Sequence, residues 1–213
     1  MKLTIFGASG GIGTAACREA IRRGHEVTAV VRDASRLAED VRAGVDVLVG
    51  DVMDPAAVES AVEGRDAVLS CLGSREGRAA TTVHTRSATS IIAGMRAAGT
   101  RRLLTVSAAA PYSDPGDGFL GGRVIKPLVS KILERPFEDL LRAETMIENA
   151  DGIDWTLVRP PMLQDGPPTG TYRLGLDHAP PKTRTIRRAD VAAAMLDLAG
   201  DPKSIGHVAW VAS

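Results

Sequence analysis

The feature that most constrains this chain is a set of three glycines directly after its first apolar segment. Gly7, Gly10 and Gly13 follow Leu3–Phe6, and a helix-like stretch begins at once. The first glycine allows a sharp turn, the second lets the backbone approach a diphosphate, and the third lets the following helix pack closely on a strand. The N–H groups at the helix start then face the anion. This spacing predicts a strand, a phosphate-binding turn and a helix.

Strand-like and helix-like segments alternate along the whole chain, which is typical of a parallel sheet covered on both faces. The expected strands are Leu3–Phe6, Val27–Val31, Val45–Val49, Ala67–Cys71, Arg102–Val106, Trp155–Val158 and Val208–Val211. The expected helices are Ile12–Arg22, Pro55–Val62, Ala80–Ala98, one within Lys126–Asn149, and Arg188–Ala199. Asp54 is suited to cap the second helix and Gly99 to end the third. Right-handed crossovers then give an α/β fold, a single-domain Rossmann-type doubly wound parallel sheet over residues 1–213.

Charge and composition argue against several kinds of partner. Lys plus Arg and Asp plus Glu number 26 each, so no net field favours nucleic acid or an anionic membrane surface. Aromatic residues make up 3%, too few for a base-stacking platform. The N-terminus shows no signal pattern, and no apolar run approaches the ~20 residues of a membrane helix. We therefore expect a cytoplasmic protein, a monomer or small homo-oligomer, whose partner is a small molecule in a pocket.

The cysteines and histidines show no spacing typical of a metal site. Cys17 and Cys71 are expected to be small buried side chains instead of a disulfide. The four histidines are scattered along the chain, as His25, His84, His178 and His207. His84 is kept as a candidate, because it lies near the start of a long helix whose N-terminal end points toward the expected cleft. The sequence predicts no metal centre.

Two long stretches rich in glycine and proline interrupt the alternation. They lie near residues 108–122 and 160–181, and each follows the end of an expected strand. Loops of that length in a compact domain are usually functional or disordered, and open α/β sheets bind ligands at the carboxyl ends of their strands. We expect these two loops to form the walls of an acceptor site. The charged stretch 184–190 that follows is expected to be a solvated helix start.

The end of the second expected strand favours NADP over NAD. At this distance from the glycine turn an acidic residue binds the ribose hydroxyls of NAD, whereas an arginine accommodates the 2′-phosphate of NADP. Arg32 comes first and Asp33 second, and Ser35 and Arg36 are placed to complete a phosphate pocket. Asp33 has two interpretations: it caps the short turn 34–38, or it is the residue that could restore use of NAD.

Later strand ends supply further candidates. Asp51 and Val52 are placed to contact an adenine, although an Asp in a strand-to-helix turn is an equally good interpretation of Asp51. Gly73 lets the backbone approach a cofactor, and Arg75 either reaches a phosphate or is solvated. Ser107 ends the fifth expected strand, where a hydroxyl would lie beside the nicotinamide.

With these residues in place, the chain resembles the atypical short-chain dehydrogenase/reductases over nearly its whole length, and among them the NADPH-dependent flavin reductases, also called biliverdin IXβ reductases. The resemblance rests on residues 5–10, 26–28, 31–33, 49–52, 66–69, 72–75, 81–83, 159–161, 169–172 and 188–190. It implies that NADP(H) is bound by Gly7, Ser9, Gly10, Gly11, Ile12, Arg32, Ser35, Arg36, Asp51, Val52, Gly73 and Arg75. It also makes Ser107 the active-site serine and residues 160–163 a wall near the nicotinamide. Positions at strand ends and in the cleft add Gly13, Leu72, His84, Thr105, Pro160 and Met162 as cofactor-binding candidates.

The chain departs from the family at the place where a proton donor would be expected. Many short-chain dehydrogenases use a Tyr-x-x-x-Lys pair, but Tyr112 is followed by Gly116, and no tyrosine here has a lysine four positions later. A serine alone is a poor general acid. In addition, His84 occupies a position that resembles an apolar cofactor contact in the flavin reductases, and Met162 replaces a pocket histidine. The loop 108–122, which would meet the substrate, matches the family poorly.

Together these observations predict an NADPH-dependent oxidoreductase that transfers hydride to a planar acceptor such as a flavin, a quinone or a tetrapyrrole-like ring. One alternative is an NADP(H)-binding redox sensor or regulator without turnover, which would keep the cofactor site and equally lack the Tyr-Lys pair. An epimerase or lyase that uses the dinucleotide transiently is less favoured, because a tyrosine base is not evident.

Overall fold

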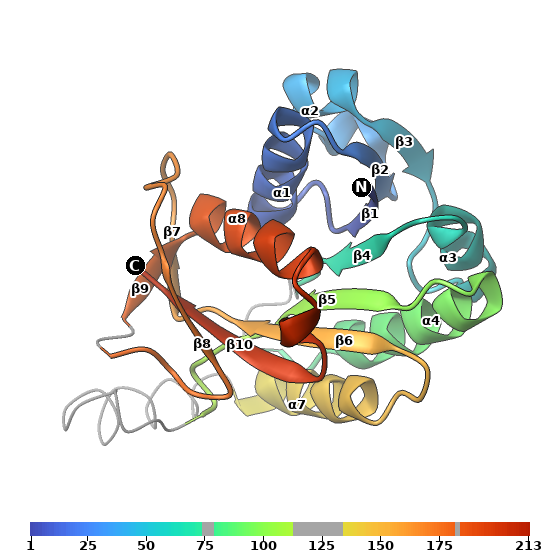
Figure 1. The fold of residues 1–213 in the computed structure, drawn as a ribbon. Helices are drawn as coiled ribbons and strands as arrows, with labels where there is room; N and C mark the ends of the chain where they lie inside the picture. Colours follow the sequence, from blue (N-terminus) through green and yellow to red (C-terminus); the bar gives the residue numbers. More distant parts are fainter. Residues whose placement is uncertain (74–78, 113–133, 182–183) are drawn as a thin grey trace.

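The computed structural model describes residues 1–73, 79–112, 134–181 and 184–213. Its centre is an eight-stranded sheet in the order β3-β2-β1-β4-β5-β6-β10-β8, in which every neighbouring pair is parallel except β10 with β8 (Figure 1). The strands are β1 (Lys2–Phe6), β2 (Glu26–Val31), β3 (Asp46–Val49), β4 (Ala67–Ser70), β5 (Arg102–Val106), β6 (Asp154–Arg159), β8 (Arg173–Leu176) and β10 (His207–Ala212). The chain order reverses between β1 and β4, so the predicted single-domain Rossmann-type doubly wound sheet is confirmed.

Helices cover both faces of this sheet (Figure 1). On one face lie α1 (Gly11–Arg22), α2 (Glu39–Gly44) and α8 (Arg188–Ala199), and on the other lie α3 (Pro55–Val62), α4 (Val83–Ala98) and α7 (Glu134–Glu148). Two short 3₁₀ turns, η1 (Ala34–Arg36) and η4 (Pro202–Ser204), join neighbouring elements. Each face has its own buried cluster, so the sheet is apolar on both sides, as parallel sheets are.

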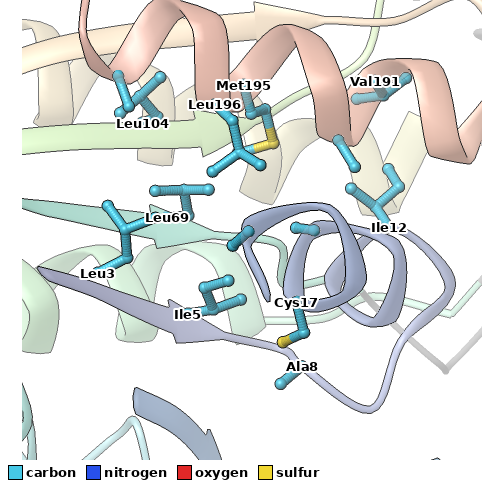
Figure 2. Packing of buried hydrophobic residues seen from close by; sticks show 14 of the residues in the cluster. Leu3, Ile5, Ala8, Ile12, Cys17, Leu69, Leu104, Val191, Met195 and Leu196 are labelled. Carbon is cyan, nitrogen blue, oxygen red and sulfur yellow. The ribbon is translucent and has the colours of Figure 1, made fainter. Parts of the chain in front are cut away.

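The cluster beneath α1 and α8 combines long side chains on the strands with short ones on α1. Figure 2 shows Leu3, Ile5 and Leu69 on the strands, with Cys17 of α1 and Met195 of α8 packed over them. All five side chains are fully buried. The small Cys17 lets the helix approach the sheet closely, and burial raises the pKa of its thiol to about 12. Both cysteines are free thiols, as predicted.

Several boundaries match the sequence-based expectations closely. The seven expected strands are all present, each with ends displaced by at most one residue. The Asp54 carboxylate accepts the N–H of Ala56 at 3.0 Å and caps α3, and Gly99 ends α4 with a φ of 72°. The helix expected from Ala80 begins at Val83, and residues 79–82 before it are not helical.

The stretch 160–181 is not the continuous loop that the sequence predicts. It contains β7 (Met162–Gln164) and β8, and β7 pairs with β9 (Thr185–Arg187) to form a separate two-stranded sheet. Strands of three or four residues are too short to show a period of two. Their partners also lie far away in the sequence, so no local pattern marks them. The helix α2 was not predicted either, because its six residues are too few to show a helical period.

We expect Gly13→Ala to disrupt the turn that joins β1 to α1. A Cβ at position 13 would lie 2.1 Å from the carbonyl oxygen of Gly7 and 2.9 Å from the Cα of Ala8, so backbone atoms would have to move. Such overpacking lowers the free energy of unfolding by about 3 kcal/mol, which chemical denaturation can measure. Gly200→Ala is the control, since its Cβ would meet no atom closer than 3.9 Å. Equal losses in the two variants would contradict the contact.

Candidate functional site

The carboxyl ends of the parallel strands meet at one edge of the sheet, and the predicted site residues gather there. Gly7 follows β1, Leu72 follows β4, Ser107 follows β5 and Pro160 follows β6. A Cβ at Gly7, whose φ is 77°, would lie 2.6 Å from the carbonyl oxygen of Cys71. The glycine turn therefore touches the end of β4, at the point of order reversal where open α/β sheets form their ligand crevice.

The start of α1 is a helix terminus without a side-chain cap. Gly10 occupies the cap position, and its N–H donates to the Gly7 carbonyl oxygen at 2.9 Å. No acidic residue stands in the first turn, and the hydroxyl of Thr14 donates back to the carbonyl of Ala8 at 2.9 Å. The N–H groups of this turn are thus left for an anion, and the close glycine backbone fits a diphosphate.

A cleft of about 650 Å³ opens beside this helix start. Ser9, Gly10 and Gly11 line it, together with Arg188 at the beginning of α8. Residues 188–190 begin α8 as expected, but residues 185–187 form β9, and the stretch is not solvated throughout because Ile186 and Asp190 are buried. Asp190 is 1% exposed, and its carboxylate accepts hydrogen bonds from both the N–H and the hydroxyl of Thr169 at 2.8 Å.

At the end of β2, a short turn arranges four of the predicted residues. The carboxylate of Asp33 accepts the N–H of Ser35 at 2.9 Å and its hydroxyl at 2.7 Å, and these bonds hold the pKa of Asp33 below its ordinary value. Asp33 is therefore the cap of η1, which was one of its two interpretations. Arg32 and Arg36 are both exposed. Arg32 makes no hydrogen bond or ion pair with another residue that the structure describes, so its guanidinium is available to a phosphate.

Asp51 also serves a turn at its own strand end. Its Oδ1 accepts the N–H of Met53 at 3.0 Å, and its carbonyl oxygen accepts the N–H of Asp54 at 3.0 Å. Val52 packs against the buried cluster beneath α3 and α4. The structure therefore gives Asp51 a local role and leaves its exposed carboxylate at the cleft side of β3.

A buried carboxylate on α7 gathers four hydrogen-bond donors. Glu144 is 3% exposed. Ser107 donates its hydroxyl to one oxygen of Glu144, and Tyr112 donates to the other. Arg159, at the end of β6, donates from Nε at 3.2 Å and from Nη2 at 2.9 Å. Each carboxylate oxygen thus has two donors, and the buried negative charge faces a guanidinium that is itself buried.

Aromatic rings cover the guanidinium of this cluster. The Cζ atom of Arg159 lies 3.5 Å from the ring centroid of Tyr112 and 5.6 Å from that of Trp210. The two rings meet edge to face, with centroids 6.2 Å apart. Burial, and then the hydrogen bond to Glu144, raise the pKa of Tyr112 above its ordinary value, so the phenol stays protonated at neutral pH. While Ser107 and Tyr112 donate to Glu144, their oxygens can only accept further hydrogen bonds.

His84 lies at the start of α4, where this helix contacts α7. Its backbone N–H donates to the Asp139 carboxylate at 2.8 Å, and that of Thr85 donates at 3.2 Å, so a side chain of α7 caps α4. A cavity of about 20 Å³, room for roughly one water, is lined by His84, Ser107 and Glu144. Burial lowers the pKa of His84, which leaves its imidazole neutral at pH 7.

The remaining predicted residues are dispersed. Leu72 and Thr105 line the same small cavity. Pro160 is buried directly after β6, whereas Met162 on β7 is 67% exposed. Arg75 and residues 113–122 of the expected acceptor loop lie outside the described residues.

The sequence reasoning missed Glu144 and Arg159 and set Tyr112 aside. Tyr112 lacks a lysine at the usual spacing, but in the fold Arg159 provides a cation over its ring. A signal for Glu144 does exist: it follows Leu140 by four positions and precedes Ile147 by three, so it stands on the buried stripe of α7. A charge on an apolar stripe requires a partner.

Two further observations bear on the kind of site. Within residues 1–73, 79–112, 134–181 and 184–213, no group of acidic, histidine or cysteine side chains is arranged to hold a metal ion. In the same ranges, no helix combines the length and the apolarity that crossing a membrane requires.

The sequence of this chain matches one family of known proteins, and its fold matches solved structures. Residues 7–202 match the NAD(P)H-binding family. The uncharacterized protein YwnB of Bacillus subtilis is 33% identical over 208 residues, which cover 92% of this chain and 91% of that one. The anaerobilin reductase ChuY of Escherichia coli O157:H7 superposes with a TM-score of 0.76 at 24% identity, covering 100% and 97% of the two chains. A short-chain dehydrogenase/reductase of Veillonella parvula in complex with NADP gives 0.80 at 20% identity, covering 100% and 94%. At these identities the two structures show a shared fold.

We expect Glu144→Gln to lower the free energy of unfolding by about 3–5 kcal/mol, because it leaves the buried charge of Arg159 without a counter-ion. Denaturant titration measures this loss. Glu138→Gln is the matched control on the same helix: it breaks an exposed ion pair with Arg142, 3.5 Å long, and should cost less than about 1 kcal/mol. Similar losses in the two variants would refute the role of Glu144 as the buried centre of the cluster.

Proposed function

Because the chain belongs to the NAD(P)H-binding family, we propose that it is an NADPH-dependent reductase of a planar acceptor. The observation that carries the proposal is the Glu144 cluster, which presents Ser107 and Tyr112 at the same sheet edge as the glycine turn. The bound cofactor supplies hydride from its nicotinamide. The side chains of this edge hold the acceptor and keep its orientation.

The preference for NADPH is supported by the turn after β2. Recognition of the NAD ribose needs a carboxylate that is free to accept from two hydroxyls. Oδ1 of Asp33 accepts both hydrogen bonds from Ser35 and is committed to the turn, whereas the exposed Arg32 and Arg36 are suited to bind a 2′-phosphate. The diphosphate is then assigned to the uncapped start of α1, and the nicotinamide to the strand ends at Leu72 and Ser107.

The acceptor is inferred from the hydrogen-bonding state of the two hydroxyls. The hydroxyl groups of Ser107 and Tyr112 both donate their hydrogen bonds to Glu144. A ligand that leaves this cluster intact must therefore donate a hydrogen bond to their oxygens. A flavin or a linear tetrapyrrole carries ring N–H groups that can donate, but a simple quinone carries only carbonyl oxygens. We therefore favour an N–H-bearing planar ring as acceptor. The structural relative ChuY is named an anaerobilin reductase, and this supports the choice of a reductase function.

The same cluster argues for a positioning role of Ser107. A hydroxyl bound to a carboxylate is a poor acid, and the raised pKa of Tyr112 makes its phenol a weaker acid than usual. The proton that accompanies the hydride is therefore drawn from water. In this assignment Glu144 and Arg159 hold the two hydroxyls in place and do not touch the acceptor.

Arg32→Ala should raise the dissociation constant of NADPH by about one to two decades and leave that of NADH nearly unchanged, because a charge-assisted contact with the 2′-phosphate is lost. Isothermal titration calorimetry with both cofactors measures this. Arg101→Ala removes the same charge at the opposite sheet edge, before β5, and serves as control. Equal affinities of the wild-type protein for NADPH and NADH would contradict the assignment of Arg32.

NADPH oxidation by the purified protein should be faster with FMN or biliverdin than with menadione, a quinone without an N–H group. Ser107→Ala should lower kcat/KM for the N–H-bearing acceptors about three- to tenfold, the cost of one hydrogen bond, with less effect on the quinone and on the affinity for NADPH. Ser60→Ala, an exposed serine of α3, is the control. Binding of NADPH without oxidation by any acceptor would favour the redox-sensor alternative.

A further inference from the structure

Arg188 lies directly over the start of α1. It is the first residue of α8, and a Cβ at Gly11 would lie 2.6 Å from its Cδ and 3.0 Å from its Nε. Its side chain therefore occupies the space that Gly11 leaves open at the first position of the helix. The two helices α1 and α8 pack together on one face of the sheet (Figure 1). This packing sets the position of Arg188 relative to the start of α1.

The guanidinium of Arg188 is held by a carboxylate from a different segment. Its Nη1 lies 2.6 Å from Oδ1 of Asp165, just after β7. The Asp165 side chain is 91% exposed and that of Arg188 is 31% exposed. An ion pair with so exposed a partner contributes little to stability and is easily exchanged for another anion.

The other charged side chains that line this cleft also form ion pairs, which point away from the glycine turn along α1 or toward α2. Arg18 pairs with Asp40 at 2.6 Å, and Arg22 pairs with Glu19 at 2.6 Å. Arg188 is the basic side chain that contacts the helix start itself. An anion bound to the N–H groups of the first turn of α1 would lie within reach of this guanidinium.

We propose that Arg188 is a second binding group for the diphosphate of the cofactor, and that Asp165 is a resident competitor which the diphosphate displaces. This inference rests on the cofactor site proposed above. With Asp165 in place, its carboxylate occupies the guanidinium of Arg188 and so competes with the anion for it. When the diphosphate takes over Arg188, the carboxylate is released into solvent at little cost, because it is already exposed.

The segment that carries Asp165 has a second attachment that keeps it at the cleft. Nη1 of Arg187 donates to the carbonyl oxygen of Pro167 at 2.7 Å. Release of Asp165 therefore leaves the 165–168 segment anchored through its backbone. The ion pair acts on the affinity for the cofactor and does not serve to close the cleft.

Calorimetric titration with inorganic pyrophosphate and with NADPH tests the proposal without any turnover. Asp165→Asn should tighten the binding of both about three- to tenfold, and Arg188→Gln should weaken both about tenfold. In the Arg188→Gln background, Asp165→Asn should have a much smaller effect, because the carboxylate acts through the arginine. Asp151→Asn, an exposed carboxylate after α7 at the opposite edge, should change neither, and thermal unfolding checks that every variant is folded.

Three results would overturn the proposal. Unchanged or weaker binding of pyrophosphate and NADPH by Asp165→Asn would show that Asp165 does not compete with the anion. Changes in binding free energy that add fully in the double variant would show that Asp165 does not act through Arg188. An effect on NADPH without one on pyrophosphate would place Asp165 at another part of the cofactor. If the wild-type protein binds NADPH but the affinities of the Asp165 and Arg188 variants differ from those expected, the cofactor site stands and this inference alone fails. If wild-type protein binds no NADPH, the cofactor site fails and the inference with it.

Discussion

The arrangement of the whole site depends on how closely α1 approaches β1. Gly13 passes the carbonyl oxygen of Gly7 at a distance where no side-chain carbon fits, and Gly7 in turn touches the end of β4. This contact brings the start of a helix into line with the ends of the neighbouring strands. The anion site, the hydroxyls after β5 and the cleft beside α8 all take their positions from it.

Opposite charges are distributed over this edge in two different ways. In the interior, Glu144 and Arg159 neutralise each other and are covered by aromatic rings, so removing either one is costly. At the rim, Arg188 and Asp165 meet in solvent, where partners exchange readily. In our proposal the buried pair holds the geometry of the site, and the exposed pair adjusts the affinity for the cofactor.

Much of the fold could be predicted from the sequence because its signals are local. Short, mostly apolar segments in regular alternation with helical ones located the central strands, and Asp54 and Gly99 marked helix ends by their own chemistry. The short strands β7, β8 and β9 could not be found, since their partners are distant and their lengths hide the alternation.

The candidate site was predictable to the extent that it follows strand ends. The glycine turn and Ser107 came from position alone. Glu144 stands on the apolar stripe of its helix, but this spacing does not say which residues are its partners, and Arg188 at a helix start looks solvated until the packing of α8 on α1 is known. The cap interpretation of Asp33 was available from the sequence, but only the structure shows that Ser35 donates both of its hydrogen bonds to one oxygen, Oδ1, of this carboxylate.

The burial of Cys17 beneath α1 gives the protein an internal reporter of local opening. A thiol with no exposure and a pKa of about 12 cannot react with a disulfide reagent until the helix lifts from the sheet. The labelling rate of Cys17, followed separately from that of Cys71, therefore measures the free energy of that opening with a native side chain as the reporter. A ligand that binds only the closed helix start slows the labelling in proportion to its occupancy. The same small side chain that permits close packing thus makes cofactor binding visible through thiol chemistry.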